Sequence, residues 1–137
     1  MFKTIALAVD GSDHAAKAVP LASELARMAN GKVVVLHVRE HDLQRGQVWE
    51  LETEEEAQSL VKKTCAEIEK NDAVAEGYVI RTVHGTVAQA LVDSARDHKT
   101  DAIVMGSRGL TDVAGMVLGS VSHKVIHLSD KPVVIAR

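Results

Sequence analysis

The sequence predicts an α/β protein in which a five-stranded parallel sheet, with strand order 3-2-1-4-5, carries helices on both faces. Five short apolar runs alternate with four segments of helical periodicity. All the runs except the third are continuously apolar, which is typical of parallel strands that are covered on both sides. Aromatic residues make up only 2% of the chain, so Val, Ile, Leu and Ala must form the core. The 137 residues are expected to form one domain, 1–137.

The first half of the chain supplies two strands and two helices. "TIALAV" (4–9) is an apolar run closed by the turn cluster "DGSD", which indicates a buried strand. Asp13 is expected to cap the next helix, whose alanines recur at helical spacing until "NG" (30–31) ends it. "KVVVLHV" (32–38) is the second strand, and "ETEEEAQSLVKKTCAEIEKN" is a second helix, with an acidic start and later lysines that complement the helix dipole.

Residues 39–52 lie between the second strand and the second helix and show no clear period. They contain Gly46 and Trp49, and we expect them to form a mobile loop that folds over a ligand or contacts a partner.

The second half supplies three strands and two helices. "EGYVIRTV" (76–83) alternates as a third strand, and "HGTVAQALVDSARDH" (84–98) predicts a turn followed by a helix. "DAIVMG" (101–106) is the fourth strand. After a glycine-rich stretch, a helix is expected over about 119–128, and "KPVVIAR" (131–137) is the fifth strand.

Composition excludes several functional classes. The formal net charge of −3 argues against broad nucleic-acid binding, which needs a basic surface. Cys65 is the only cysteine, so an internal disulfide and a thiolate metal cage are both excluded. The first apolar run ends at Asp10, too early for a signal peptide or a membrane span, so we expect a cytoplasmic protein with no membrane partner.

The predicted strand order places a ligand site between the first and fourth strands, because ligands bind where the winding of such a sheet reverses. Gly106 and Gly109 would let a ligand lie against the backbone. Gly119 and Ser120 open the last helix, whose free N–H groups and partial positive charge attract phosphate. Asp10, across the crevice, could take a ribose hydroxyl or hold a metal ion on the phosphates.

Plainer interpretations remain open at each of these positions. The glycines could serve only as turn residues, Ser120 only as a helix cap and Asp10 only as a turn former. Arg108 and Lys124 could be surface charges or could reach a phosphate. No P-loop, dinucleotide fingerprint or nucleophile elbow is present.

Two histidine pairs have a spacing of four residues, namely His37 with His41 and His123 with His127. Two imidazoles alone are a weak indication of a metal site, because structural zinc sites need more ligands. We expect these side chains to be solvated or hydrogen-bonded.

The chain resembles the universal stress protein family over its whole length. The resemblance rests on "ALAVDGSDHAAKAV", "VVVLHV", "HGTVAQALVDSA", "DAIVMGSRG", "GSVSHKVI" and "KPVVIAR". The ATP-binding subgroup of that family carries the pattern G-x2-G-x9-G-[ST], which is complete here from Gly106 to Ser120.

The resemblance implies that adenine lies against Ala8 and Val38, that Asp10 lies near the ribose and phosphates, and that Mg²⁺ accompanies ATP. It also implies a phosphate cradle at the start of the last helix. With Val9 and Arg108 beside these positions, the candidate cofactor-binding residues are Ala8, Val9, Asp10, Val38, Met105, Gly106, Arg108, Gly109, Gly119, Ser120, Val121 and Ser122, with Asp10 as the candidate metal ligand.

The resemblance implies an ATP-binding regulatory protein of the stress response, a homodimer joined through the last strand, 132–136. At most weak ATP hydrolysis is expected, because no side chain is well placed to activate water. An alternative is a slow ATP hydrolase or transferase that uses Asp10, with Ser12 as a further candidate. A nucleotide-independent interaction protein is a third hypothesis, against which the intact glycine pattern argues.

Overall fold

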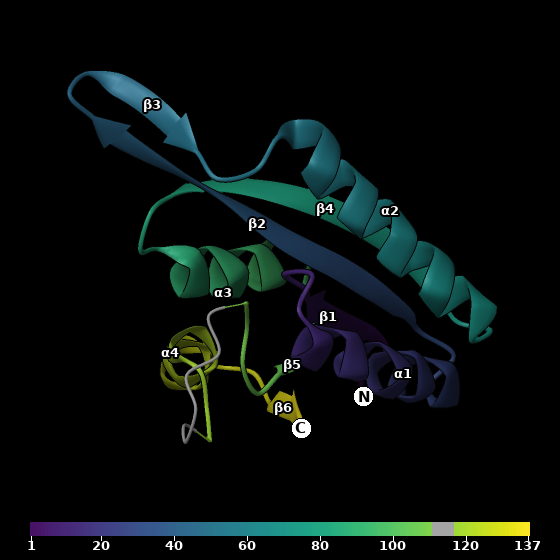
Figure 1. Ribbon diagram of the computed structural model, residues 1–137. Coiled ribbons are helices and arrows are strands. Elements are labelled where there is room, and N and C mark those ends of the chain that lie inside the picture. Colours follow the sequence, from purple (N-terminus) through teal and green to yellow (C-terminus); the bar gives the residue numbers. More distant parts are fainter. Residues whose placement is uncertain (111–116) are drawn as a thin grey trace.

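A computed structural model describes residues 1–110 and 117–137, and the middle of the glycine-rich stretch, 111–116, lies outside the described residues (Figure 1). Strands and helices alternate along most of the chain. The elements are β1 (Thr4–Ala8), α1 (Asp13–Met28), β2 (Lys32–Gln44), β3 (Gln47–Glu50), α2 (Glu54–Lys70), β4 (Val74–Val83), α3 (Val87–Asp97), β5 (Ala102–Gly106), α4 (Ser120–Leu128) and β6 (Val133–Ala136).

The parallel part of the sheet has the predicted strand order. β4 pairs with β2, β2 with β1, β1 with β5 and β5 with β6, all of them parallel. In the numbering of the five predicted strands this is the order 3-2-1-4-5. The winding therefore reverses at β1, between its neighbours β2 and β5, as the fold class requires for a ligand site at the carboxyl edge.

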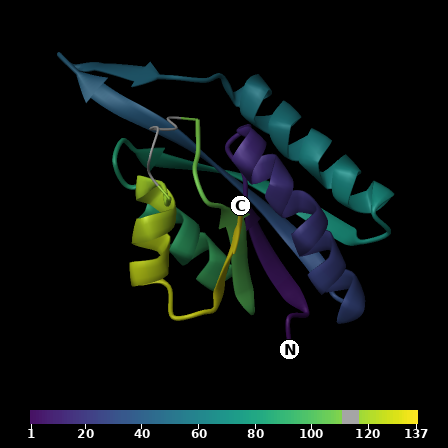
Figure 2. The same ribbon diagram turned by 60° about the horizontal axis from the view of Figure 1, so that its bottom comes forward.

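The helices cover both faces of the sheet in pairs, α1 with α2 and α3 with α4 (Figure 2). Alternate residues of the central strands serve the two cores: Ile5 and Leu7 pack on the α1 and α2 side, while Ala6 and Ala8 pack on the α3 and α4 side. Because both sides are buried, these strands are continuously apolar, as predicted.

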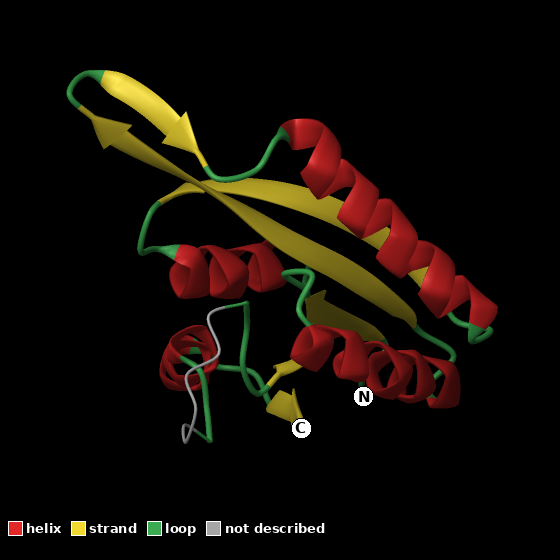
Figure 3. Ribbon diagram, viewed as in Figure 1, coloured by secondary structure: helices red, strands yellow, loops and turns green. Residues whose placement is uncertain are grey.

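The prediction of a loop over residues 39–52 is wrong. β2 continues to Gln44, a two-residue turn at Arg45 and Gly46 follows, and β3 returns antiparallel to β2, which adds a sixth strand to the sheet. Both turn residues have positive φ angles, 51° and 77°, the conformation that matches the twist of a tight hairpin. Figure 3 shows the two strands joined by this short turn and extending away from the helices. We call residues 41–50 the hairpin arm.

Burial explains why the arm escaped prediction. All four residues of β3 are exposed, so neither face of the arm imposes an apolar alternation on the sequence. A smaller correction concerns the start of α1, where the Oγ of Ser12, not Asp13, caps the helix by accepting the N–H of Ala15 at 3.1 Å.

No helix within residues 1–110 and 117–137 combines the length and the apolar character that crossing a bilayer requires.

Candidate functional site

One edge of β2 is interrupted next to the carboxyl end of β1. β4 pairs with Lys32–His41 of β2, and β1 pairs with Lys32–Leu36, so β1 and β4 occupy opposite edges. His41 pairs with both β4 and β3, which places β3 on the same edge as β1. Among the described strands, residues 37–40 therefore have no partner on that edge, and the backbone there is open between β1 and β3.

A cavity of about 510 Å³ lies at this interruption, within the size range of ligand pockets. We call it the switch-point cavity. It is bounded by the carboxyl ends of β1 and β5, the middle of β2, the start of α3 and the start of α4. Every residue predicted for the candidate site lines it, as do Ala15, His37, Glu40, Leu51, Glu52, Val87, Leu91 and Leu110. The geometry thus brings the predicted residues together; their role in nucleotide binding stays a prediction.

One wall of the cavity is an apolar slot. Its side chains come from β1, β2, α3, β5 and α4, and they are Ala8, Val38, Val87, Leu91, Met105 and Val121. Ala8, Leu91 and Met105 are buried in the core between the sheet and the two helices α3 and α4. Such a slot suits a flat, largely apolar group, and a heterocyclic base is of that kind.

Asp10 is held rigidly at the end of β1. Its Oδ1 accepts the N–H of Ser12 at 2.9 Å, and its Oδ2 accepts the N–H of Leu110 at 3.2 Å. A Cβ on Gly109 would lie 2.5 Å from Oδ2. Gly109 thus has a structural reason to lack a side chain, because Asp10 occupies that space; that a ligand also lies against this backbone stays a prediction.

Gly106 has a similar structural explanation. A Cβ at this position would lie 2.5 Å from the backbone carbonyl of His14. The glycine therefore allows the first turn of α1 to pack against the end of β5. This packing explains why no side chain is present at Gly106, and its contact with a ligand stays a prediction.

The start of α4 presents backbone donors to the cavity. Gly119 occupies the cap position with φ −70°, and its own N–H donates to the Ser107 carbonyl at 2.7 Å. The N–H groups of the first helical residues, Ser120 and Val121 among them, lack intrahelical partners and carry the positive end of the helix dipole. The Ser122 hydroxyl, however, is buried and donates to the Gly106 carbonyl at 2.9 Å, so this hydroxyl is committed to an internal partner.

The buried His37 and the half-buried Glu52 form a pair that sequence reasoning missed. The Nδ1 of His37 lies 2.8 Å from the Val9 carbonyl, which can only accept, so Nδ1 carries a proton. The Nε2 lies 2.6 Å from the Oε1 of Glu52. A hydrogen bond at that distance requires a second proton, on either Nε2 or Glu52. The pair ties the segment between β3 and α2 to the end of β1, beside the cavity.

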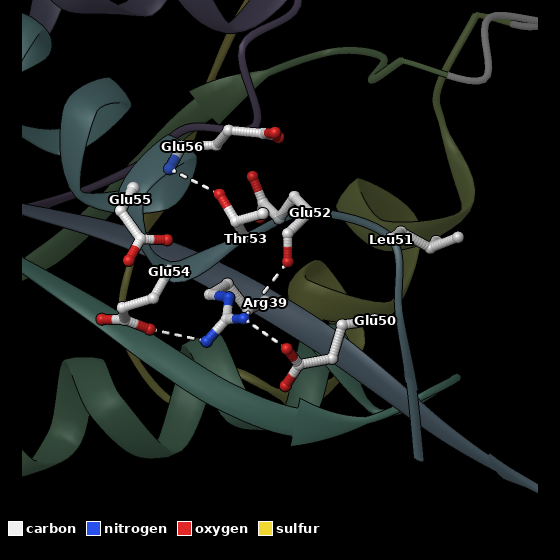
Figure 4. A pocket seen from close by; sticks show the side chains of 8 residues that line it. All are labelled: Arg39, Glu50, Leu51, Glu52, Thr53, Glu54, Glu55 and Glu56. Atoms are coloured by element: carbon white, nitrogen blue, oxygen red, sulfur yellow. Dashed lines mark hydrogen bonds and ion pairs between the residues drawn. The ribbon is translucent and has the colours of Figure 1, made fainter. Parts of the chain in front are cut away.

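A second hollow lies next to the switch-point cavity and surrounds Arg39 (Figure 4). This guanidinium is buried and forms ion pairs with Glu50 at 2.7 Å and Glu54 at 2.5 Å, and it also donates to the Glu52 carbonyl at 3.2 Å. Because a buried charge is stable only when it is paired, the acidic residues around Arg39 are explained by its burial. The ion pairs of Arg39 therefore link the arm, through Glu50, to the start of α2, through Glu54.

Other titratable groups add little chemistry. Within the described part of the chain, no three His, Cys, Asp or Glu side chains are grouped so that they could hold a metal ion. The rings of His123 and His127 contact each other edge to face. Away from the cavity, burial raises the pKa of the Cys65 thiol, with smaller contributions from Glu69 and Glu76. The hydrogen bond that Arg27 donates to the Glu24 carboxylate raises the pKa of Arg27.

Comparison with known proteins agrees with this geometry. The model of the universal stress protein family matches residues 1–137. Universal stress protein YxiE of Bacillus subtilis is 35% identical over 148 residues, an alignment that covers 100% of both chains.

Two solved structures are similar over nearly all of both chains, each with a TM-score of 0.74 and 25% sequence identity. One is the universal stress protein from Archaeoglobus fulgidus in complex with dAMP, for which the match covers 100% of this chain and 98% of the other. The second is a universal stress protein in complex with cAMP, with 99% and 97% covered. From the match over its whole length and the shared fold, we conclude that the chain belongs to the universal stress protein family.

Proposed function

We propose that this protein binds ATP with Mg²⁺ in the switch-point cavity and acts as a regulatory protein of the stress response. One observation carries the proposal: the residues of the glycine pattern, the end of β1, the middle of β2 and the start of α4 all line a single cavity. The cavity joins an apolar slot to a helix N-terminus, and these two environments suit the base and the phosphates of one nucleotide.

In this proposal the adenine occupies the slot beside Ala8, Val38 and Met105, and the phosphates lie at the start of α4. The backbone at Gly109, Gly119, Ser120 and Val121 forms the cradle, with the Arg108 side chain nearby. The dAMP and cAMP complexes of the two structural relatives support an adenine nucleotide as the ligand class.

The residues present fit a nucleotide-bound Mg²⁺. Each Asp10 oxygen accepts one backbone N–H, so each keeps a lone pair that can bind a cation or its water. Mg²⁺ is commonly held by one or two carboxylates together with substrate phosphates and waters. A single rigid carboxylate is therefore sufficient on the protein side, and the phosphates would complete the site.

The alternative, slow hydrolysis or transfer, would use Asp10 as a metal-holding or catalytic group. The two N–H groups that Asp10 already accepts favour holding a cation over taking a proton from substrate. Release of phosphate from ATP should therefore be negligible, and steady turnover that is lost in Asp10→Ala would favour the enzyme.

The decisive experiment is a calorimetric titration of ATP–Mg²⁺ into the wild-type protein, Gly119→Ala and Gly119→Val. A Cβ at Gly119 would lie 3.3 Å from the Arg108 Cα, so alanine requires a small shift, whereas the branched valine crowds the cradle. We expect wild-type binding, a modest loss for alanine and a loss of at least tenfold for valine. Unfolding midpoints check that both variants fold, and absence of wild-type binding at millimolar ATP would refute the proposal.

We also propose a cytoplasmic homodimer joined through residues 132–136. Among the described strands, β6 pairs only with β5, so its second edge is free to pair with another chain. Sedimentation analysis should give the mass of two chains, and a single chain at all concentrations would exclude the dimer.

A further inference from the structure

Glu40 lies at the open edge of β2 and lines the switch-point cavity, next to the apolar slot. We propose that the carboxylate of Glu40 selects the base of the bound nucleotide by accepting a hydrogen from an exocyclic amino group, so that a 6-aminopurine is preferred over a 6-oxopurine. This inference rests on the proposed function and names the chemical feature of the ligand that the site recognises.

The backbone beside Glu40 already has the polarity that such a base needs. The Leu36 carbonyl accepts the N–H of Val9, so it faces the edge on which β1 lies. In a strand, residues two apart present their backbone groups to the same edge, and Val38 and Glu40 therefore face the open interval between β1 and β3. The Val38 N–H is a donor, and its carbonyl, an acceptor, lies on the Glu40 side of it.

This arrangement directs an amino group toward Glu40. A base that accepts from the Val38 N–H through a ring nitrogen and donates to the Val38 carbonyl through its amino group matches both backbone groups. The amino group then lies at the Glu40 end of the base. One of its two hydrogens bonds to Val38, and the second points onward along β2.

Glu40 is positioned to receive that second hydrogen. Its Oε2 accepts the N–H of Gly85 at 3.1 Å and lies 2.7 Å from the Nδ1 of His84, so the loop before α3 fixes the carboxylate. Within the described residues, its Oε1 makes no hydrogen bond. A 6-oxopurine would instead direct a carbonyl oxygen at this carboxylate, and two acceptors that face each other repel.

Neighbouring charged groups leave this role to Glu40. The Glu52 carboxylate is bound to His37 through its Oε1 and belongs to the segment between β3 and α2, not to the edge of β2 that carries Val38 and Glu40. Asp10, at the end of β1, accepts two backbone N–H groups. Arg39 is committed to Glu50 and Glu54.

The test compares the dissociation constants of ATP and inosine triphosphate for the wild type, Glu40→Gln and Glu40→Ala. A hydrogen bond to a charged acceptor contributes about ten- to hundredfold in affinity. We therefore expect the preference of the wild type for ATP to fall by at least about tenfold in both variants. Because glutamine can turn its NH₂ toward an oxo group, Glu40→Gln should also bind inosine triphosphate more tightly than the wild type does.

That gain separates base selection from a merely structural role, since a damaged fold would weaken both nucleotides. Glu76→Gln, at a carboxylate that pairs with Lys32 outside the cavity, is the matched control and should leave the ratio unchanged. An unchanged ratio in Glu40→Gln and Glu40→Ala, with ATP still bound, would overturn the inference alone. Absence of binding of either nucleotide to the wild type would instead overturn the proposed function.

Discussion

The two ends of β2 belong to the same strand and yet have opposite surroundings. Its first half, Lys32–Leu36, lies between β1 and β4, and Val33, Val34 and Val35 are completely buried. Its second half enters the hairpin arm, where Leu43 and its partner Val48 are largely exposed. The open edge at residues 37–40 separates the two halves. One strand thus builds the core, borders the cavity and forms a projecting arm, and only the first of these roles depends on burial.

The largest expected contrast is between the glycines that flank β2. A Cβ on Gly31 would lie 2.0 Å from the Lys3 carbonyl oxygen, and backbone atoms on both sides cannot move apart without opening the sheet. We expect Gly31→Ala to lower the free energy of unfolding by about 3 kcal/mol or more. Gly46→Ala, in the turn of the arm, meets no neighbour and should cost about 1 kcal/mol through its φ of +77°. Urea unfolding of both variants measures the difference; equal losses would contradict it.

An intermediate effect on stability is expected for two valines, one in the buried half of β2 and one in β3 of the arm. Val35 is 0% exposed, and Val35→Ala should destabilise by about 2 kcal/mol because it removes packed methyl groups and leaves a cavity. Val48 is 57% exposed, so Val48→Ala should change the free energy of unfolding by less than about 0.5 kcal/mol. Thermal unfolding followed by circular dichroism compares the two. A large loss for Val48→Ala would mean that the arm is covered in solution.

A smaller effect is expected at the junction between the halves. Glu52→Ala leaves the Nε2 of the buried His37 without its partner and should cost about 1 kcal/mol. Glu52→Gln should cost less, because its NH₂ can donate to the neutral imidazole without the additional proton that the wild-type pair requires. Chemical unfolding gives both values, and nitrogen chemical shifts of His37 report the position of the protons. If alanine and glutamine were equally destabilising, the hydrogen bond would have no measurable role.

Most of the fold could be predicted because burial on both faces leaves a clear record in the sequence. The strands β1, β2 and β5 are continuously apolar, and the order of the parallel strands follows from their alternation with helices. The arm could not be predicted from an apolar period, because residues 43–50, most of the arm, are exposed. In retrospect Arg45 and Gly46 were the available signal, since a glycine in a two-residue turn is common in tight hairpins.

The residues of the candidate site likewise divide into those that the sequence predicted and those that it did not. The glycine pattern and the strand ends identified residues that line the cavity, since both are local features of the chain. Glu40, Leu51 and Glu52 were missed, because they reach the cavity only through the extension of β2 and the return of the chain after β3. The sequence also could not reveal why positions 106 and 109 must be glycine. The atoms that exclude a side chain there belong to His14 and Asp10, which are distant in sequence.

From sequence came the α/β class, the order of the parallel strands and the helix start at Gly119, all of which arise from local periodicity and chain direction. Tertiary structure alone decided which polar groups remain available to a ligand. The Ser122 hydroxyl, the Oε1 of Glu52 and the Oε2 of Glu40 are committed to internal partners, whereas the Oε1 of Glu40 makes no hydrogen bond among the described residues. Such commitments are pairings between residues far apart in the chain, and they exist only once the strands and helices have packed.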